Sequence, residues 1–220
     1  MSGKDVTFEV QGQPAAGYLA LPDRSNAPGV LVLHAWWGLN PIFKQLCDKL
    51  AAEGFAAFAP DVNSGIVAKT IDEAKQTMEK LDGERKYNVV TSAPDFLRNQ
   101  PGVRNEPFAV IGFSMGAAWA LVLTEERPQD IQKIVMFYGA GEADYSKVKA
   151  DIIGHFAEKD EWEDEKYIRA MEDGMKAAGL KVQFNTYPNT SHWFFENDRP
   201  EFNAEAADLA WKRTLEFLKK

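Results

Sequence analysis

The sequence predicts an α/β fold built on a mainly parallel central sheet with helices on both faces. Short apolar runs alternate with amphipathic stretches along the chain, and most of these runs are continuous, as in strands covered on both faces. The chain has 220 residues, of which 45% are hydrophobic, enough for one sizeable core. We therefore expect a single domain that spans residues 1–220.

The strands are predicted from apolar runs bounded by turn residues. The first two runs alternate polar and apolar residues more strictly than the rest and lie close together, as in an antiparallel edge hairpin. The eight predicted strands are residues 6–10, 17–21, 30–34, 55–59, 108–112, 134–138, 152–157 and 182–187.

The helices are predicted from capping residues and apolar periodicity. Asn40 and Pro41 supply an N-cap and a first-turn proline, and Gly54 ends that helix. Another helix is expected over residues 163–178, with Gly179 as its C-terminal stop. Further helical segments are expected over residues 71–81, around Pro94, after Gly116, and from Ala207 to Leu218. Residues 61–86 are expected to form either a cap over a binding site or a plain surface excursion.

Composition narrows the classes of partner. The chain has 25 Lys and Arg against 33 Asp and Glu, a net charge of −8, and an acidic surface repels nucleic-acid phosphates and anionic lipid heads. Three histidines and one cysteine show no metal-ligand spacing, and no nucleotide-binding glycine loop occurs, so no cofactor is expected. We expect a small-molecule partner, with no nucleic acid and no membrane.

The cellular location is predicted from the first residues and from the apolar runs. The N-terminus leads into a strand-like segment rather than an apolar signal stretch, and no run is long enough to span a bilayer. Cys47 is the only cysteine, so no internal disulfide is possible. These features predict a cytoplasmic protein that acts as a monomer or homodimer.

The segment Gly112-Phe113-Ser114-Met115-Gly116 has the pattern G-x-S-x-G between a predicted strand and a predicted helix. A nucleophile raised on such a tight turn has strained backbone angles, and the residues two positions away must be small. The N-terminus of the helix then directs N–H groups at developing negative charge. This context favours Ser114 as the nucleophile of an α/β-hydrolase fold; the alternative is a glycine-rich turn with an ordinary N-cap serine.

A general base must follow the nucleophile in this fold. Of the three histidines, His34 precedes Ser114, and His155 lies in an apolar run where a hydrogen-bonded strand histidine is expected. His192 lies in a turn-rich loop after the last predicted strand. His192 is therefore the predicted base.

The acid of a triad is expected where the strand before that loop ends. Asp160 begins the loop after residues 152–157, with Glu158 and Glu161 beside it, and a short carboxylate there can reach the imidazole Nδ1. Asp160 is the predicted acid. The alternative is that this acidic run forms a solvated helix start, where acids are also favoured.

With these three residues placed, the sequence resembles the dienelactone hydrolase family of α/β-hydrolases. The resemblance depends on residues 29–40 (GVLVLHAWWGLN), residues 58–61 (FAPD), the nucleophile motif, residues 158–160 (EKD) and residues 191–194 (SHWF). It implies that Ser114, Asp160 and His192 form a catalytic triad. It also implies an oxyanion hole made by the backbone N–H groups of Trp36 and Met115.

The sequence departs from the family pattern at three positions. The dienelactone-cleaving members use cysteine where this chain has Ser114, and many members carry glutamate where it has Ala35. An arginine that holds the substrate carboxylate is replaced by Glu196, which would repel an anion, and Arg85 and Arg199 are candidate replacements. The resemblance therefore implies hydrolysis of esters or lactones, with small neutral esters preferred. The alternatives are a true dienelactone hydrolase (carboxymethylenebutenolidase) and a non-catalytic ligand-binding protein of the same fold.

Aromatic residues gather near the predicted site residues in the sequence. Trp37 follows the predicted oxyanion donor, and Trp193 and Phe194 follow His192. We expect Trp37, Trp193 and Phe194, with Arg85, to contact substrate. The alternative is that half of the aromatic residues fill the core.

Overall fold

The computed structural model describes residues 3–220, which form eight strands and six helices. Met1 and Ser2 lie outside the described residues. They begin the N-terminal segment for which no signal sequence is predicted. The chain divides into two compact units, Met1–Val110 and Ile111–Lys220. That all 220 residues form one domain stays a prediction.

The first unit contains strands in the order β1-β2-β4-β3. β1 (Lys4–Val10) and β2 (Gln13–Ala20) form an antiparallel hairpin, as the alternating pattern predicted. β2 pairs antiparallel with β4 (Ala56–Pro60), and β4 pairs in parallel with β3 (Gly29–Leu33). Every residue of β3 and β4 is buried, which explains why their sequences are apolar throughout.

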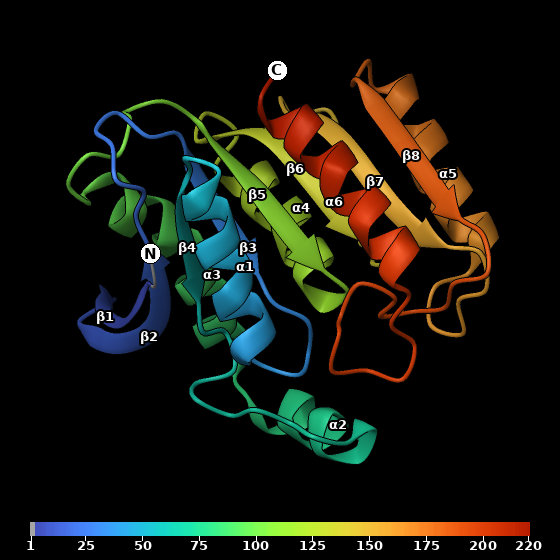
Figure 1. Ribbon diagram of the computed structural model, residues 1–220, viewed down its shortest axis with the longest axis horizontal. Coiled ribbons are helices and arrows are strands. Elements are labelled where there is room, and N and C mark those ends of the chain that lie inside the picture. The colour runs from blue at the N-terminus through green and yellow to red at the C-terminus, as the bar shows by residue number, and fades with distance from the viewer. Residues whose placement is uncertain (1–2) are drawn as a thin grey trace. The chain divides into compact units, whose positions relative to one another are not determined.

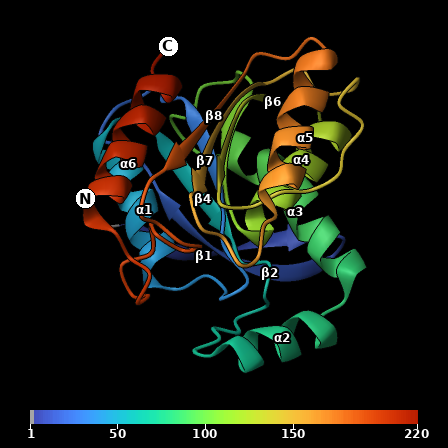
Figure 2. The same ribbon diagram turned by 90° about the vertical axis from the view of Figure 1, so that its right-hand side faces the viewer.

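The first helix of this unit starts at the predicted cap. The side chain of Asn40 accepts the N–H groups of Ile42 and Phe43 and begins α1 (Pro41–Ala52). Figure 2 shows α1 and α3 (Gly83–Arg98) on opposite faces of this unit's strands. α2 (Ile71–Lys80) projects from the rest of the unit in Figures 1 and 2, and the possible cap function of residues 61–86 stays a prediction.

The second unit contains strands in the order β5-β6-β7-β8, and β5 (Phe108–Phe113) begins three residues before this unit in the sequence. β6 (Ile131–Phe137), β7 (Asp151–Ala157) and β8 (Val182–Tyr187) pair in parallel. β8 is last in the order and is only partly buried. The prediction that this strand is covered on both faces is therefore wrong. Edge strands have one unpaired side, which tolerates polar residues.

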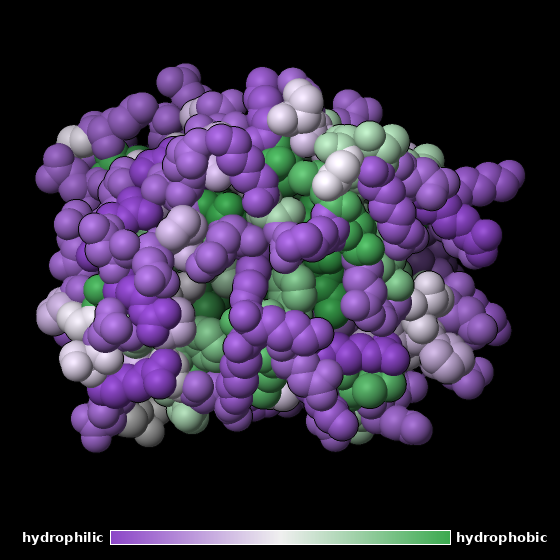
Figure 3. All heavy atoms as spheres, turned by 90° about the horizontal axis from the view of Figure 1, so that it is seen from above, coloured by the Kyte–Doolittle hydropathy of each residue, from purple (hydrophilic) through white to green (hydrophobic). Residues whose placement is uncertain are grey.

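Helices cover both faces of the strands of the second unit (Figure 2). α4 (Met115–Glu126) and α5 (Glu165–Ala177) lie on one face, and α6 (Ala204–Leu218) lies on the other. Hydrophilic residues cover most of the face shown in Figure 3, with hydrophobic residues visible between them. None of the helices described in residues 3–220 is long and apolar enough to cross a membrane.

Candidate active site

Ser114 lies at the turn between β5 and α4 in a strained backbone conformation, with φ 51° and ψ −118°. A Cβ atom at Gly112 would lie 2.3 Å from the carbonyl oxygen of Gly116, so the turn requires glycine at position 112. A Cβ atom at Gly139 would lie 2.2 Å from the carbonyl oxygen of Ser114. The turn therefore depends on a glycine in the motif and on a second glycine after β6.

The hydroxyl of Ser114 contacts a histidine rather than the helix that follows it. Within the described part of the chain, the side chain makes no capping hydrogen bond to α4. Ser114 Oγ instead lies 2.9 Å from His192 Nε2. Ser114 is therefore not an ordinary N-cap serine, which was the alternative interpretation of this motif.

His192 bridges the serine and a carboxylate. Its Nδ1 lies 2.9 Å from Asp160 Oδ1 and 2.8 Å from Oδ2, and the two side chains are 4% and 7% exposed. A carboxylate only accepts hydrogen bonds, so Nδ1 carries the proton and the lone pair of Nε2 faces the hydroxyl of Ser114. This tautomer leaves Nε2 able to accept the hydroxyl proton.

Asp160 is held in place by the backbone of its own loop. Its Oδ1 accepts the N–H groups of Trp162, at 2.9 Å, and of Glu163, at 3.0 Å. The cap of α5 is a different acid, Asp164, whose side chain accepts the N–H groups of Lys166 and Tyr167. The predicted alternative of an acidic helix start therefore describes Asp164 and not Asp160.

Three aromatic rings surround His192, and only one of them is exposed. The rings of Tyr138 and Trp193 lie 5.0 Å and 4.9 Å from the imidazole, and that of Trp162 lies at 6.4 Å. Trp193 is 5% exposed, whereas Trp162 is 42% exposed. Of these three rings, Trp162 is therefore the one that is open to a ligand, although Trp193 was the residue predicted to contact substrate.

Phe194, which was predicted to contact substrate, packs among other aromatic rings. Its side chain is fully buried, with its ring 5.4 Å from that of Tyr138 and 5.2 Å from that of Tyr187. Phe194 is a core residue that fixes the loop carrying His192. Its position beside His192 in the sequence suggested contact with a ligand, but the loop turns its ring inward.

Glu196 is fully buried in the same loop. Its Oε1 accepts the hydroxyl of Tyr138 at 3.0 Å, and its Oε2 has no hydrogen-bond partner among residues 3–220. Burial raises the pKa of Glu196 to about 8, against the opposing effect of the Tyr138 hydrogen bond. The side chain is therefore mostly neutral at pH 7, so it does not repel anions through a full charge as the sequence suggested.

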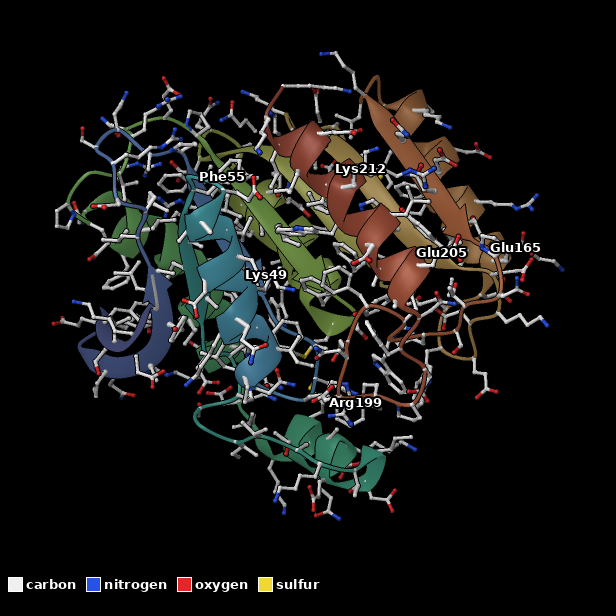
Figure 4. The ribbon with its side chains drawn as sticks, in the orientation of Figure 1. Lys49, Phe55, Glu165, Arg199, Glu205 and Lys212 are labelled. Atoms are coloured by element: carbon white, nitrogen blue, oxygen red, sulfur yellow. The ribbon has the colours of Figure 1, made fainter. Side chains whose placement is uncertain are left out.

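The arginine candidates are engaged elsewhere. Arg199 lies in the loop that leads from β8 to α6, as Figure 4 shows, and pairs with Asp198 at 3.2 Å. Arg85 donates to the carbonyl oxygens of Val10, at 3.2 Å, and Pro14, at 2.8 Å, in the β1–β2 hairpin. These bonds give Arg85 a structural role in the first unit, and its contact with substrate stays a prediction.

The remaining predicted residues divide between loop and core. Trp36, the predicted oxyanion donor, is half-buried in the loop between β3 and α1. The neighbouring Trp37 is 2% exposed, and its contact with substrate stays a prediction. His155 is fully buried, with Nδ1 2.8 Å from Tyr187 Oη and Nε2 3.0 Å from Thr214 Oγ1. Burial lowers the pKa of His155 to about 3, so it is the hydrogen-bonded strand histidine that was expected.

Sequence reasoning missed Tyr138 and Gly139. They directly follow β6, whose last residue, Phe137, accepts the N–H of Ser114 through its carbonyl oxygen at 2.9 Å. Tyr138 also has a positive φ of 34°. Ligands of open parallel sheets bind at the carboxyl ends of strands, and that rule could have singled out this pair.

The fold is similar to that of solved α/β-hydrolases, and comparison with a family model identifies the family. The model of the dienelactone hydrolase family matches residues 15–220. The chain belongs to the dienelactone hydrolase family. It is therefore an enzyme that hydrolyses a small-molecule substrate.

Individual relatives match along nearly the whole chain. Protein usf of Aquifex pyrophilus is 32% identical over 228 residues, covering 99% of this chain and 98% of the relative. A protein of Aquifex aeolicus (strain VF5) named "Putative carboxymethylenebutenolidase" is 30% identical, covering 99% of this chain and 98% of its own. The crystal structure of a dienelactone hydrolase-like promiscuous phosphotriesterase from metagenomic libraries has a TM-score of 0.88 at 21% identity, covering 99% and 97% of the two chains.

Proposed function

We propose that this enzyme cleaves carboxylic esters or lactones through an acyl-enzyme, with Ser114 as nucleophile, His192 as general base and Asp160 as the orienting acid. One observation carries the proposal: an unbroken line of contacts joins Ser114 Oγ to His192 Nε2, at 2.9 Å, and His192 Nδ1 to Asp160, at 2.8 Å. A hydroxyl is a weak nucleophile unless an adjacent base removes its proton. The separations and the tautomer of His192 suit that proton transfer.

The reaction proceeds in two halves. Ser114 Oγ attacks the carbonyl carbon while Nε2 of His192 takes the hydroxyl proton, and the resulting imidazolium then protonates the leaving alcohol. Neutral His192 next removes a proton from water, which attacks the acyl-enzyme, and the imidazolium returns this proton to Ser114 Oγ as the acid is released. Asp160 keeps Nδ1 protonated throughout and stabilises the imidazolium.

The developing oxyanion requires two N–H donors. We assign them to the backbone of Met115 and Trp36. Met115 is the first residue of α4, and the first N–H groups of a helix lack carbonyl partners within the helix. Trp36 lies in the loop after β3, and it is assigned because its place in the sequence matches the family pattern.

The substrate proposed is a small uncharged ester. The exposed ring of Trp162 offers an apolar surface beside His192, and the buried carboxyl of Glu196 supplies no positive charge. Arg199 is already paired with Asp198. These features favour p-nitrophenyl acetate over a lactone that carries a carboxylate.

The test is hydrolysis of an ester and lactone panel by the wild-type enzyme and by Ser114→Ala and His192→Ala. We expect each variant to lose about 10³-fold or more in kcat, because the nucleophile and base act as one unit. Circular dichroism would check that both variants are folded. Near-wild-type turnover by both folded variants would contradict the proposal, and a preference for the carboxylated lactone would overturn the substrate class alone.

A further inference from the structure

Tyr138 lies beside both the proposed nucleophile and the proposed base, within the second unit. It directly follows β6, whose last residue, Phe137, accepts the N–H of Ser114 at 2.9 Å. The N–H of Tyr138 donates to the carbonyl oxygen of His155 at 2.8 Å. Its side chain is fully buried, and its ring centroid lies 5.0 Å from that of the His192 imidazole. Tyr138 is therefore fixed to the strand that holds Ser114 and packs against His192.

The hydroxyl of Tyr138 reaches the loop that carries His192. It donates to Glu196 Oε1 at 3.0 Å, and Glu196 is also fully buried. Within the described part of the chain, the Glu196 side chain makes no other hydrogen bond. Tyr138 thus contacts this loop at two points, through its ring at His192 and through its hydroxyl at Glu196.

Two tight turns join Glu196 to His192 along the loop. The N–H of Glu196 donates to the carbonyl oxygen of Trp193 at 2.9 Å, and the N–H of Phe194 donates to that of Ser191 at 3.2 Å. Each bond closes a turn of four residues, and the two turns overlap. A shift of the Glu196 side chain would therefore move the imidazole of His192 as well.

The bond between Tyr138 and Glu196 lies where water does not replace it, because both side chains are fully buried. Its loss would leave a buried polar group without a partner, which favours loop conformations that expose this group. Proton transfer from Ser114 requires His192 Nε2 to stay within about 2.6–3.2 Å of the hydroxyl oxygen. The 2.9 Å separation in the structure meets this requirement.

We propose that Tyr138 and Glu196 are positioning residues whose buried hydrogen bond holds the His192 loop at the distance from Ser114 that proton transfer requires. The inference depends on the proposed function, because it assumes that Ser114 and His192 react. Neither side chain is exposed to a substrate. Loss of the bond should therefore lower kcat and leave KM nearly unchanged.

Two substitutions of Glu196 separate the hydrogen bond from the packing. Burial raises the pKa of Glu196 to about 8, so glutamine resembles the neutral carboxyl and keeps an acceptor for Tyr138. Methionine has a similar length, but its sulfur is only a weak acceptor. In the hydrolysis of p-nitrophenyl acetate at pH 7, we expect Glu196→Met to lose about tenfold in kcat with KM within about twofold of wild type. Glu196→Gln should keep kcat within about twofold.

The other partner of the bond gives a second test. Tyr138→Phe removes the hydroxyl and keeps the ring beside His192, so its kcat should also fall by about tenfold. The double variant Tyr138→Phe/Glu196→Met should lie within about twofold of either single variant, because both changes remove the same bond. If Glu196→Met does not fold, Tyr138→Phe decides.

The matched control is Tyr187→Phe, which removes another hydroxyl from the same buried aromatic cluster. The ring of Tyr187 lies 5.2 Å from that of Phe194, but its hydroxyl contacts His155 Nδ1, at 2.8 Å, instead of the His192 loop. Tyr187→Phe should lower the midpoint of urea unfolding and keep kcat within about twofold of wild type. Equal falls in kcat in Tyr138→Phe and Tyr187→Phe would indicate a merely structural role and overturn the inference.

The outcomes are distinguishable from failure of the proposed function. If Ser114→Ala retains turnover, the proposed function is wrong and this inference is wrong with it. If Ser114→Ala is inactive while folded Tyr138→Phe turns over at the wild-type rate, only the positioning role is overturned. Equal losses in Glu196→Gln and Glu196→Met would also overturn that role, because glutamine keeps the acceptor.

Discussion

Two histidines in the second unit have both ring nitrogens hydrogen-bonded, yet they suit opposite purposes. His155 lies within β7 between the hydroxyls of Tyr187 and Thr214, is fully buried, and stays neutral because burial lowers its pKa to about 3. His192 lies in a loop between the carboxylate of Asp160 and the hydroxyl of Ser114. The hydrogen-bond partners therefore determine the role of each histidine: a carboxylate stabilises imidazolium, whereas two hydroxyls in an apolar interior do not.

The largest expected effect comes from changing the carboxylate partner of His192. Asp160→Asn removes the charge that stabilises imidazolium and allows the wrong tautomer, so kcat/KM should fall by about 10³- to 10⁴-fold. Hydrolysis of p-nitrophenyl acetate measures the loss. The control is Glu161→Gln, which changes an exposed acid next to Asp160 and should leave the rate unchanged.

The buried acid Glu196 should make the free energy of unfolding depend on pH. Its pKa of about 8 exceeds the ordinary 4.5, so the folded protein keeps a proton that the unfolded chain loses between these values. The contribution of this group to the free energy of unfolding is therefore highest below about pH 4.5. It falls as pH rises to about 8, by a total on the order of 5 kcal/mol, and then levels off.

Glu196→Gln should remove this pH dependence. The variant should gain stability over wild type from pH 5 to pH 9, as measured by urea unfolding at each pH, while Glu161→Gln should show no such trend. A difference between Glu196→Gln and wild type that stays constant with pH would contradict the neutral buried carboxyl.

The comparison of the histidines also predicts a reversed pattern of losses. His155→Gln should cost about 2–4 kcal/mol of stability, because it leaves two buried hydroxyls poorly paired, and should leave kcat unchanged. His192→Gln should abolish turnover at a smaller cost in stability. Urea unfolding and steady-state kinetics should be measured on both variants. Equal losses of activity would contradict the distinction between a structural His155 and a catalytic His192.

The smallest effect expected is on substrate affinity. Trp162→Ala removes the exposed ring beside His192 and should raise KM for an aromatic ester by about three- to tenfold, with kcat and stability nearly unchanged. Tyr167→Ala, a change at a similarly exposed ring on α5, is the matched control. An unchanged KM in Trp162→Ala would remove Trp162 from the proposed binding surface.

The fold was predictable from the sequence because its signals are local. Strand–turn–helix placement marked Ser114, and the chain order of the fold left only one histidine after the strands. Capping by Asn40 and the edge hairpin followed from backbone chemistry that neighbouring residues reveal. The proximity of Ser114, His192 and Asp160 was predictable for the same reason.

The surroundings of the site were not predictable, because they depend on burial. Phe194 and Trp193 follow His192 in the sequence, but the loop turns both inward and leaves Trp162 exposed. From the sequence, Glu196 is expected to be an anion, whereas burial raises its pKa to about 8 and keeps it mostly neutral at pH 7. Tyr138 contacts both Glu196 and His192 through tertiary packing that no local pattern reveals.

The central claim, that His192 activates Ser114, is tested most directly by labelling with a fluorophosphonate. We expect one adduct, on Ser114, formed at the wild-type rate in His155→Gln and about 10³-fold more slowly in His192→Gln. An adduct on another residue, or equal labelling rates in the two histidine variants, would contradict it.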